Sequence, residues 1–392
     1  MSNQLGGKAA IVGIGATEFS KASGRSEMSL ACEAVLAAIT DAGLQPSDID
    51  GMVTYTAETN PEIEIARHVG IGSLRHFSRV HHGGGAACGT VALAAMAVAT
   101  GAADAVVCYR AFNERSGRRF GSGVQDLPQM ATAEAAAYAW TSPYGQLTPA
   151  SWVAMMARRY MHHYGVTSED FGRVAVADRL HAATNPKAWF YNQPITLEDH
   201  QNSRWIVEPL HLLDCCQESD GGQALVVVSA DRVNDLPNPP AYIRAAAQGS
   251  GADQWSMTSF YRPDIDQLHE MKVVANELWA SSGLGPNDIQ TAVLYDHFSP
   301  FVLIQLEEFG FCERGEAKDF IRNGNIELGG DLPINTHGGQ LGEAYIHGMN
   351  GIAEGVRQVR GTSVNQIPRV TNVLVTAGTG VPTSGLILST ER

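Results

Sequence analysis

Short apolar runs alternate with longer amphipathic segments along this chain, and the alternation predicts an α/β fold. β-branched runs of strand length predict buried strands at 9–13, 105–108, 224–228 and 373–375. Segments with helical spacing of apolar residues predict helices at 88–100, 148–163, 300–310 and 346–359. Between 114 and 218 the pattern is irregular, aromatic and rich in Gly, Pro and His, which predicts a lid region inserted in the first half. We therefore expect sheets covered by helices.

A diverged internal repeat predicts two similar halves. Residues 42–55 align without a gap with residues 282–295, and seven of the fourteen positions are identical. Each copy follows an amphipathic helix, predicted at about 28–42 and about 266–282, and ends in a short buried strand whose last residue is a tyrosine. In the second copy this residue is Tyr295, at the carboxyl end of a strand, where open α/β sheets hold their ligands.

The glycines and prolines of the repeat mark its turns and the junction of the halves. Gly43 and Gly283 are expected to end their helices with a positive φ, and a proline three residues later starts the next turn. The proline-rich segment 234–240 predicts the junction. The N-terminal half then spans 1–236, including the insert at 114–218, and the C-terminal half spans 241–392.

Composition and charge exclude several classes of function. The 392 residues carry a formal net charge of −14, and the 27 Lys and Arg are spread singly, so no basic patch for nucleic acid or an anionic membrane is expected. The polar start and the absence of an apolar run near the ~18 residues of a membrane span predict neither a signal peptide nor a membrane helix. Six cysteines without a CxxC pair are typical of a reduced compartment. We expect a soluble cytoplasmic protein.

The sequence favours neither a metal centre nor a lysine Schiff base. The adjacent pairs His81-His82 and His162-His163 would point apart on a regular element, and no HxxxH or Cys-rich cluster accompanies them. Only five lysines are present, and none ends an apolar strand. No cofactor is therefore expected.

Several ordered blocks resemble thiolases of the sterol-carrier-protein-X type over nearly the whole chain. They include the segments 144–150, 157–161 and 203–222, and the glycine motif from Gly329 to Gly351 with its Gly338-Gly339 pair. The resemblance implies the thiolase fold, in which two βαβαβαββ halves pack as five layers in αβαβα order, usually in a dimer.

The positions that carry thiolase chemistry have changed. Ala86 stands where the family has its nucleophilic cysteine, and Tyr295 and Tyr345 match two family histidines. The last glycine loop, Thr376 to Gly380, also lacks a cysteine. Cys88 is the rival nucleophile, but a shift of two residues turns a helical side chain by about 200°. We expect Cys88 to pack in the core.

A site for an oxyanion is expected where Gly83-Gly84-Gly85 precedes a helix, because a helix start offers N–H donors and the positive end of its dipole. A tight strand-to-helix turn explains the same glycines equally well. The resemblance implies that the thioester oxygen is received at Ala86 and in the loop from Gly378 to Gly380. It adds Gly339, His297 and His347 to the expected substrate-binding residues.

The two tyrosines are expected to act as acid and base. An unperturbed phenol, with a pKa near 10, is ionised in only about one molecule in a thousand at neutral pH, so it is a proton source. To act as a base it needs a neighbour, for which His297 or His347 would serve. A single buried tyrosine is more often a core residue, but both fall on active-site positions of the family.

The segments Tyr295-Asp296-His297-Phe298 and Glu343 to Gly348 resemble those of the bacterial steroid side-chain aldolases of the lipid-transfer-protein-2 type. This resemblance implies retro-aldol cleavage of a 17-hydroxy steroid 20-carboxyl-CoA to a 17-keto steroid and propionyl-CoA, which needs no acyl-enzyme. Tyr345 would take the hydroxyl proton and Tyr295 would return one to the α carbon, although the roles can be exchanged. An acyl-transferring thiolase using Cys88 and a non-catalytic acyl-CoA or sterol binding protein stay open.

The resemblance also implies partners. It predicts a homodimer, and a complex with a protein that carries a zinc-ribbon and an OB-type (DUF35) domain.

Overall fold

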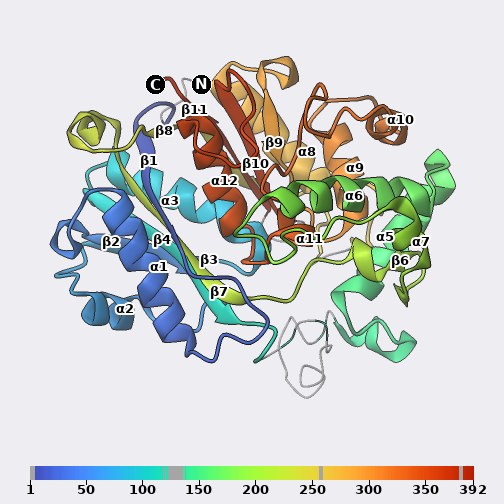
Figure 1. The fold of residues 1–392 in the computed structure, drawn as a ribbon, viewed down its shortest axis with the longest axis horizontal. Coiled ribbons are helices and arrows are strands. Elements are labelled where there is room, and N and C mark those ends of the chain that lie inside the picture. The colour runs from blue at the N-terminus through green and yellow to red at the C-terminus, as the bar shows by residue number, and fades with distance from the viewer. Residues whose placement is uncertain are drawn as a thin grey trace.

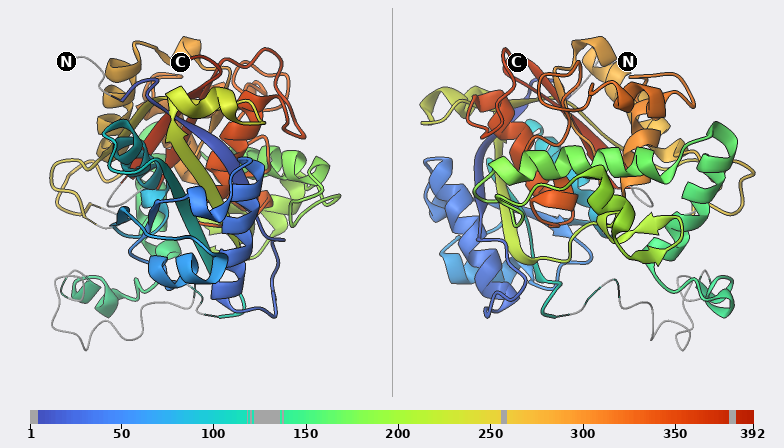
Figure 2. Two further views of the ribbon diagram at one scale, coloured as in Figure 1. Left: turned by 90° about the vertical axis from the view of Figure 1, so that its left-hand side faces the viewer. Right: turned by 45° about the vertical axis from the view of Figure 1, so that its right-hand side comes forward.

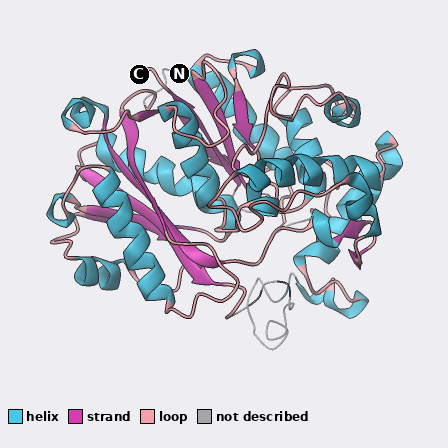
Figure 3. Cartoon of the chain, viewed as in Figure 1, coloured by secondary structure: helices cyan, strands magenta, loops and turns pink. Residues whose placement is uncertain are grey.

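In the described part of the chain, the centre of the molecule is a nine-stranded mixed sheet, made of a first-half sheet and a second-half sheet that join edge to edge (Figure 1). The computed structural model describes residues 5–117, 119, 121, 136, 138–255, 259–378 and 383–392. In this part of the chain the strand order is β3-β2-β4-β7-β1-β8-β11-β10-β9. Only two residue pairs, Ala10 with Tyr242 and Ile11 with Ala241, connect β1 to β8, so the first-half and second-half sheets join along a short seam. Figure 3 shows the sheets and the helices that cover them.

The first half contributes β1 (Ala9–Ala16), β2 (Gly51–Tyr55), β3 (His76–Val80), β4 (Ala105–Asn113) and β7 (Asp220–Ser229). The second half contributes β8 (Ala241–Gly249), β9 (Thr291–Val293), β10 (Asn372–Ala377) and β11 (Thr383–Ser389). A separate small sheet pairs β5 (Trp205–Val207) with β6 (Leu210–His211). β2 runs parallel to β3 and β4, whereas β7 runs antiparallel to β4 and β1.

Helices cover the outer faces of both sheets and fill the space between them (Figure 2). α1 (Glu27–Asp41) packs outside the first sheet and α8 (His269–Ser282) outside the second. α3 (Ala87–Ala99) and α12 (Met349–Arg360) lie between the two sheets. The other helices are α2 (Glu62–Val69), α5 (Pro149–Tyr164), α6 (Ser168–Thr184), α7 (Leu197–Asn202), α9 (Ser299–Glu308), α10 (Ala317–Arg322) and α11 (Gly339–Gly342).

The sequence explains why α3 takes the central layer. It is apolar nearly all round and rich in alanine, and such a helix is stable only when it is enclosed on every side. Its small residues let both sheets approach closely. Neighbouring residues of β4 alternate between two cores: Val106 and Cys108 face α3, while Val107 and Tyr109 face α1. This is the expected αβαβα order, and the predicted thiolase fold is confirmed.

The repeat is confirmed in detail. Gly43 and Gly283 both have φ of 71° and follow α1 and α8. Each is followed by a short 3₁₀ turn, Pro46–Asp48 or Pro286–Asp288, and then by β2 or β9. The predicted strands and helices all appear, with ends that differ by a few residues.

The insert at 114–218 lies between β4 and β7 and contains more helix than the single helix predicted there at 148–163. Residues 118, 120, 122–135 and 137 lie outside the described residues, but the remainder holds α5, α6 and α7. α6 buries residues around most of its circumference, polar ones such as Asp178 included, so its sequence shows no single apolar stripe. It packs across the second half against α9 and α11 (Figure 1). None of the helices in the described ranges is long and apolar enough to cross a membrane.

Candidate functional site

The end of β9 fixes Tyr295. This residue lies two positions beyond the strand, and its N–H donates to Thr376 Oγ1 at 2.9 Å. Its carbonyl accepts a hydrogen bond of 2.9 Å from Gln305 Nε2 on α9. The side chain is buried, with 3% of its surface exposed. Hydrogen bonds with Thr376 on β10 and Gln305 on α9 thus fix the backbone of Tyr295.

Tyr345 comes from the loop between α11 and α12. Its N–H donates to Ser219 Oγ at 3.1 Å, at the start of β7. The beginning of the loop is fixed by the Asp296 carboxylate, which accepts the N–H groups of Gln340 and Leu341 at 2.9 and 3.0 Å. A Cβ on Gly339 would lie 2.1 Å from Asp296 Oδ2, so this predicted substrate-binding position must be glycine for the loop to close on Asp296.

The two tyrosines meet at their hydroxyl groups. Tyr295 donates a hydrogen bond to Tyr345, with 3.1 Å between the oxygen atoms. Burial raises the pKa of both phenols well above the usual value, because the phenolate loses its hydration. The hydrogen bond between them changes the two pKa values in opposite directions. It lowers the pKa of Tyr345, which accepts the bond, and raises the pKa of Tyr295, which donates it. The phenolate of Tyr345 would therefore be stabilised by the hydrogen bond that the Tyr295 hydroxyl donates to it.

The glycine run leaves room for the Tyr295 hydroxyl. A Cβ on Gly84 would lie 1.5 Å from Tyr295 Oη, so any side chain there would occupy the place of the hydroxyl. The run forms a 3₁₀ turn at Gly84–Ala86 that leads into α3. Ala86 is fully buried, and its N–H already donates to the Gly83 carbonyl at 2.9 Å. In the last glycine loop Gly378 is buried with φ of 83°, whereas Gly380 lies outside the described residues.

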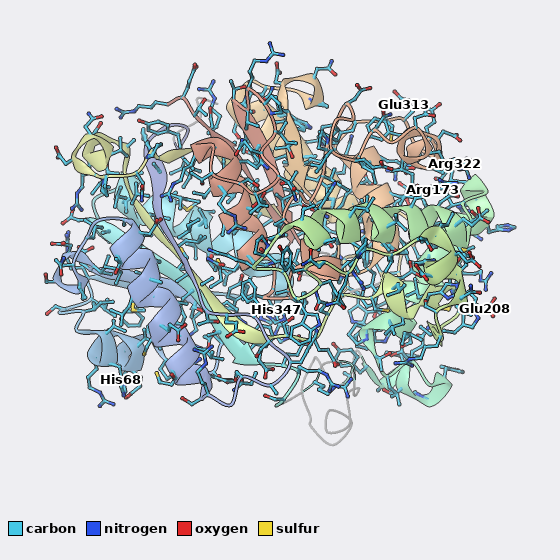
Figure 4. The ribbon with its side chains drawn as sticks, viewed as in Figure 1. His68, Arg173, Glu208, Glu313, Arg322 and His347 are labelled. Carbon is cyan, nitrogen blue, oxygen red and sulfur yellow. The ribbon has the colours of Figure 1, made fainter. Side chains whose placement is uncertain are left out.

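His347 is held by a buried ion pair. Arg110 Nε donates to its Nδ1 at 3.1 Å, and Arg110 Nη1 pairs with Glu58 at 2.9 Å. Phe112 stacks on the imidazole with ring centroids 5.0 Å apart. Burial and the Arg110 charge lower the pKa of His347 well below its usual value, so the ring is neutral. Figure 4 shows His347 near the centre of the molecule, as expected for a residue of the site.

His297 is also a neutral, buried ring. It stacks on Phe301 with centroids 4.5 Å apart, and its ring centroid lies 4.8 Å from that of Tyr295. Burial lowers the pKa of His297 to about 3. The two histidines expected as neighbours of the tyrosines are therefore present, and both are uncharged at neutral pH.

The repeat brings a third tyrosine to the site. Tyr55 ends β2 as the counterpart of Tyr295, and its hydroxyl donates to the His347 carbonyl at 3.2 Å. Sequence symmetry alone could have revealed this residue, since the same alignment that located Tyr295 pairs it with Tyr55.

Cys88 lies in the core, as expected. It is fully buried on α3, and its Sγ donates to the Val375 carbonyl on β10 at 3.7 Å. Burial raises the pKa of the thiol, which removes the thiolate that a nucleophile requires.

Several residues of the site were missed from the sequence. Arg110, Phe112 and Glu114 occupy alternate positions along β4 and just beyond it, whereas the predicted strand ended at 108. The signal was a pair of charged residues, Arg110 and Glu114, that follow the buried apolar run four positions apart and therefore lie on one face of an extended chain. Among the residues described, no three His, Cys, Asp or Glu side chains are placed to hold a metal ion.

Comparisons with known proteins extend over the whole chain. Residues 9–231 match the family model of the thiolase N-terminal domain, and residues 251–390 match that of the thiolase C-terminal domain-like family. A steroid side-chain-cleaving aldolase from Thermomonospora curvata is 73% identical over 388 residues, which are 99% of each chain. A 17-hydroxy-3-oxo-4-pregnene-20-carboxyl-CoA lyase from Mycobacterium tuberculosis is 67% identical, covering 98% of this chain and all of its own. A solved structure named Ltp2-ChsH2(DUF35) aldolase aligns with a TM-score of 0.95 at 73% identity, over 99% of both chains.

Proposed function

Because this chain belongs to the thiolase family and is 73% identical to a steroid side-chain-cleaving aldolase, we propose that it is a carbon–carbon lyase acting on a steroid acyl-CoA. Its substrate would be a 17-hydroxy steroid 20-carboxyl-CoA, cleaved to a 17-keto steroid and propionyl-CoA. One observation carries the mechanism: two buried phenols share a hydrogen bond where the family places catalytic histidines, beside an alanine in place of the nucleophilic cysteine. A retro-aldol reaction requires an acid and a base but no acyl-enzyme.

The two phenols supply a balanced proton cycle. Tyr345, in its phenolate form, takes the proton of the C17 hydroxyl, and the C17–C20 bond breaks to give the ketone and the thioester enolate. Tyr295 then protonates the α carbon, which completes propionyl-CoA. Tyr345 now carries a proton and Tyr295 has lost one, and their hydrogen bond of 3.1 Å lets the proton return. The cycle leaves the charge of the protein unchanged.

The surroundings of each phenol support this division of roles. The Tyr295 hydroxyl lies against Gly84 at the turn before α3, where the dipole of the helix start favours a negative enolate. A group beside the enolate is placed to protonate its α carbon. Tyr345 accepts the hydrogen bond from Tyr295, which stabilises its phenolate and makes it the better base.

The Ala86 N–H already donates to the Gly83 carbonyl, so the enolate oxygen would be stabilised by the helix-start dipole and by the loop at Gly378. Neutral His297 and His347 lie beside Tyr295 and Tyr345, with ring centroids 4.8 and 5.0 Å apart. They take no proton in the cycle, because burial disfavours their charged forms.

We also propose a homodimer and a complex with a DUF35-type partner. The DUF35-type partner is supported by the high similarity to the solved structure named Ltp2-ChsH2(DUF35) aldolase, whereas the homodimer rests on the resemblance to thiolases alone. Co-expression with such a partner is expected to increase yield and activity, measured by size-exclusion chromatography and turnover. A fully active homodimer without the partner would contradict this requirement.

The decisive assay follows propionyl-CoA and 17-keto steroid release from 17-hydroxy-3-oxo-4-pregnene-20-carboxyl-CoA by chromatography. We expect the two products in equal amounts and no acyl-enzyme in the mass spectrum of the intact protein. Acyl labelling that disappears in Cys88→Ala would instead indicate a thiolase. Tight thioester binding without turnover would indicate a binding protein.

A further inference from the structure

The glycine turn before α3 is the part of the site that a ligand can reach. Gly83 and Gly84 are only half-buried, whereas the side chains of Tyr295 and Tyr345 are no more than 9% exposed. The Ala86 N–H donates to the Gly83 carbonyl, so the helix start supplies its dipole to the enolate but not this N–H group. A further donor for the enolate oxygen is expected to face the turn.

The imidazole of His347 faces this turn. Among the described atoms outside its own segment, those nearest to a Cβ built on Gly83 are His347 Cε1 and Nε2, at 3.7 and 3.8 Å. The ring also packs edge to face on Tyr345, with centroids 5.0 Å apart and an angle of 88° between the planes. The Nε2 edge of His347 therefore lies against the half-buried turn, beside Tyr345.

Arg110 decides which nitrogen of His347 carries the proton. Its Nε donates to Nδ1 of the imidazole at 3.1 Å. A guanidinium group has only donors and stays protonated in proteins, so Nδ1 must be the acceptor. In a neutral imidazole whose Nδ1 accepts, the proton is on Nε2. His347 thus presents an N–H donor to the turn.

Glu58 holds Arg110 in this position. Arg110 Nη1 pairs with the Glu58 carboxylate at 2.9 Å, and both side chains are at most 2% exposed. The same carboxylate accepts the N–H groups of Ala111 and Asn60, each at 2.9 Å. A buried cation needs such a partner, because it has lost its hydration. Glu58, Arg110 and His347 therefore form a fixed chain of hydrogen bonds.

The backbone of His347 is constrained as well. Its φ of 50° lies in the left-handed region, which is unfavourable for a residue other than glycine. The Tyr55 hydroxyl donates to its carbonyl at 3.2 Å, and Phe112 stacks on the ring. Such backbone conformations persist where the surroundings impose them, and they cluster at functional sites. The ring is held at its backbone, its face and its Nδ1, as a preorganised donor requires.

We propose that Nε2–H of His347 donates a hydrogen bond to the thioester oxygen as the enolate forms, and that Arg110 and Glu58 are positioning residues that keep this donor directed at it. This inference rests on the proposed function. The imidazole is neutral and keeps its proton throughout, so it leaves the Tyr345 phenolate intact. Neutral imidazoles polarise substrate carbonyl groups in this way.

Nitrogen NMR of the enzyme with ¹⁵N-labelled histidine reports the tautomer directly. His347→Gln identifies the His347 signals by their absence. At neutral pH we expect a protonated Nε2 and an unprotonated Nδ1, and a shift of the Nε2 signal when propionyl-CoA binds. A protonated Nδ1 would overturn the proposal, as would an Nε2 signal that propionyl-CoA leaves unchanged.

Exchange of the α hydrogens of propionyl-CoA in D₂O isolates enolate formation from carbon–carbon cleavage. His347→Gln places an amide N–H near the position of Nε2, whereas His347→Asn reaches only as far as Nδ1 and tolerates the positive φ. Exchange and kcat should fall on the order of 10² in His347→Asn and less than about tenfold in His347→Gln. His68→Gln, which changes an exposed histidine on α2 far from His347 in Figure 4, is the control and should match wild type.

The double variant Arg110→Met with Glu58→Gln tests the positioning pair without leaving a buried charge unpaired. We expect its His347 signals to show a mixture of tautomers and its kcat to fall by about tenfold or more, as for other partners that orient a histidine. A merely structural role would lower the melting temperature and leave the nitrogen signals unchanged. If the double variant does not fold, Arg110→Lys replaces it, since Lys keeps the charge but not the fork.

The outcomes separate this inference from the proposed function. If wild type neither exchanges α hydrogens nor releases propionyl-CoA, the proposed function fails and this inference fails with it. If wild type does both and folded His347→Asn does so equally well, only the role of His347 is overturned. Equal losses in the Gln and Asn variants would mean that the ring packs and does not donate, which also overturns it. Unchanged nitrogen signals in the double variant would overturn the role of Arg110 and Glu58.

Discussion

Substitution of Gly84 by alanine tests the position of Tyr295 without touching the phenol. The new Cβ would lie 1.5 Å from Tyr295 Oη, whereas real Cβ contacts are not shorter than 3.0 Å, so the hydroxyl must move by about 1.5 Å. It cannot swing freely, because Gly348 also lies against the ring: a Cβ there would lie 2.8 Å from Tyr295 Cε2. A displacement of about 1 Å can cost on the order of 10² in rate. We expect kcat of Gly84→Ala to fall by at least that factor.

The assay is steady-state release of propionyl-CoA, with thermal melting measured in parallel. Overpacking of this kind costs about 1–3 kcal/mol, so the variant should fold with a lower melting temperature. Gly72→Ala is the control, since a Cβ there meets nothing within 4 Å. It should match wild type in both measurements. A folded Gly84→Ala enzyme with wild-type kcat would refute the argument that Tyr295 must sit against this turn.

Three further predictions follow from the same site. Tyr295→Phe and Tyr345→Phe should each lower kcat on the order of 10² or more with nearly unchanged thioester binding, and the double variant should be little worse than the worse single one, as kinetics and binding titrations can check. Cys88→Ala should keep cleavage within about tenfold, because a buried thiol with a raised pKa packs and does not react; total loss in a folded protein would contradict the aldolase mechanism. Below the raised pKa of Tyr345 its phenolate increases with pH, so kcat/KM should rise by about tenfold per unit from pH 7 to 9. The pH profile should show no break near 6.5, since burial lowers the pKa of His297 to about 3 and that of His347 well below normal; a break there would assign a proton-transfer role to one of them.

Much of the site could be predicted because local sequence decides which residues end a strand or a turn. The repeat at 42–55 and 282–295 located Tyr295 at a strand end, and the resemblance of the block from Glu343 to Gly348 to thiolases located Tyr345, both without coordinates. Helix-ending glycines and the β-branched runs likewise determined most strands and helices, since their conformations depend on neighbouring residues. The sequence did not predict α6 in the insert, because this helix is enclosed on several sides and its pattern has no single apolar face.

Only the tertiary structure decided how these residues meet. Tyr295 and Tyr345 lie 50 positions apart, and their hydrogen bond exists because Ser219 and Asp296 hold the two segments together. The pKa shifts of the phenols and of His347 arise from burial between two sheets, which depends on the packing of residues that are distant in sequence. The sequence by itself therefore determined the fold and the identity of the two tyrosines that we propose as the acid–base pair. Its geometry and protonation came from long-range packing, which no local pattern encodes.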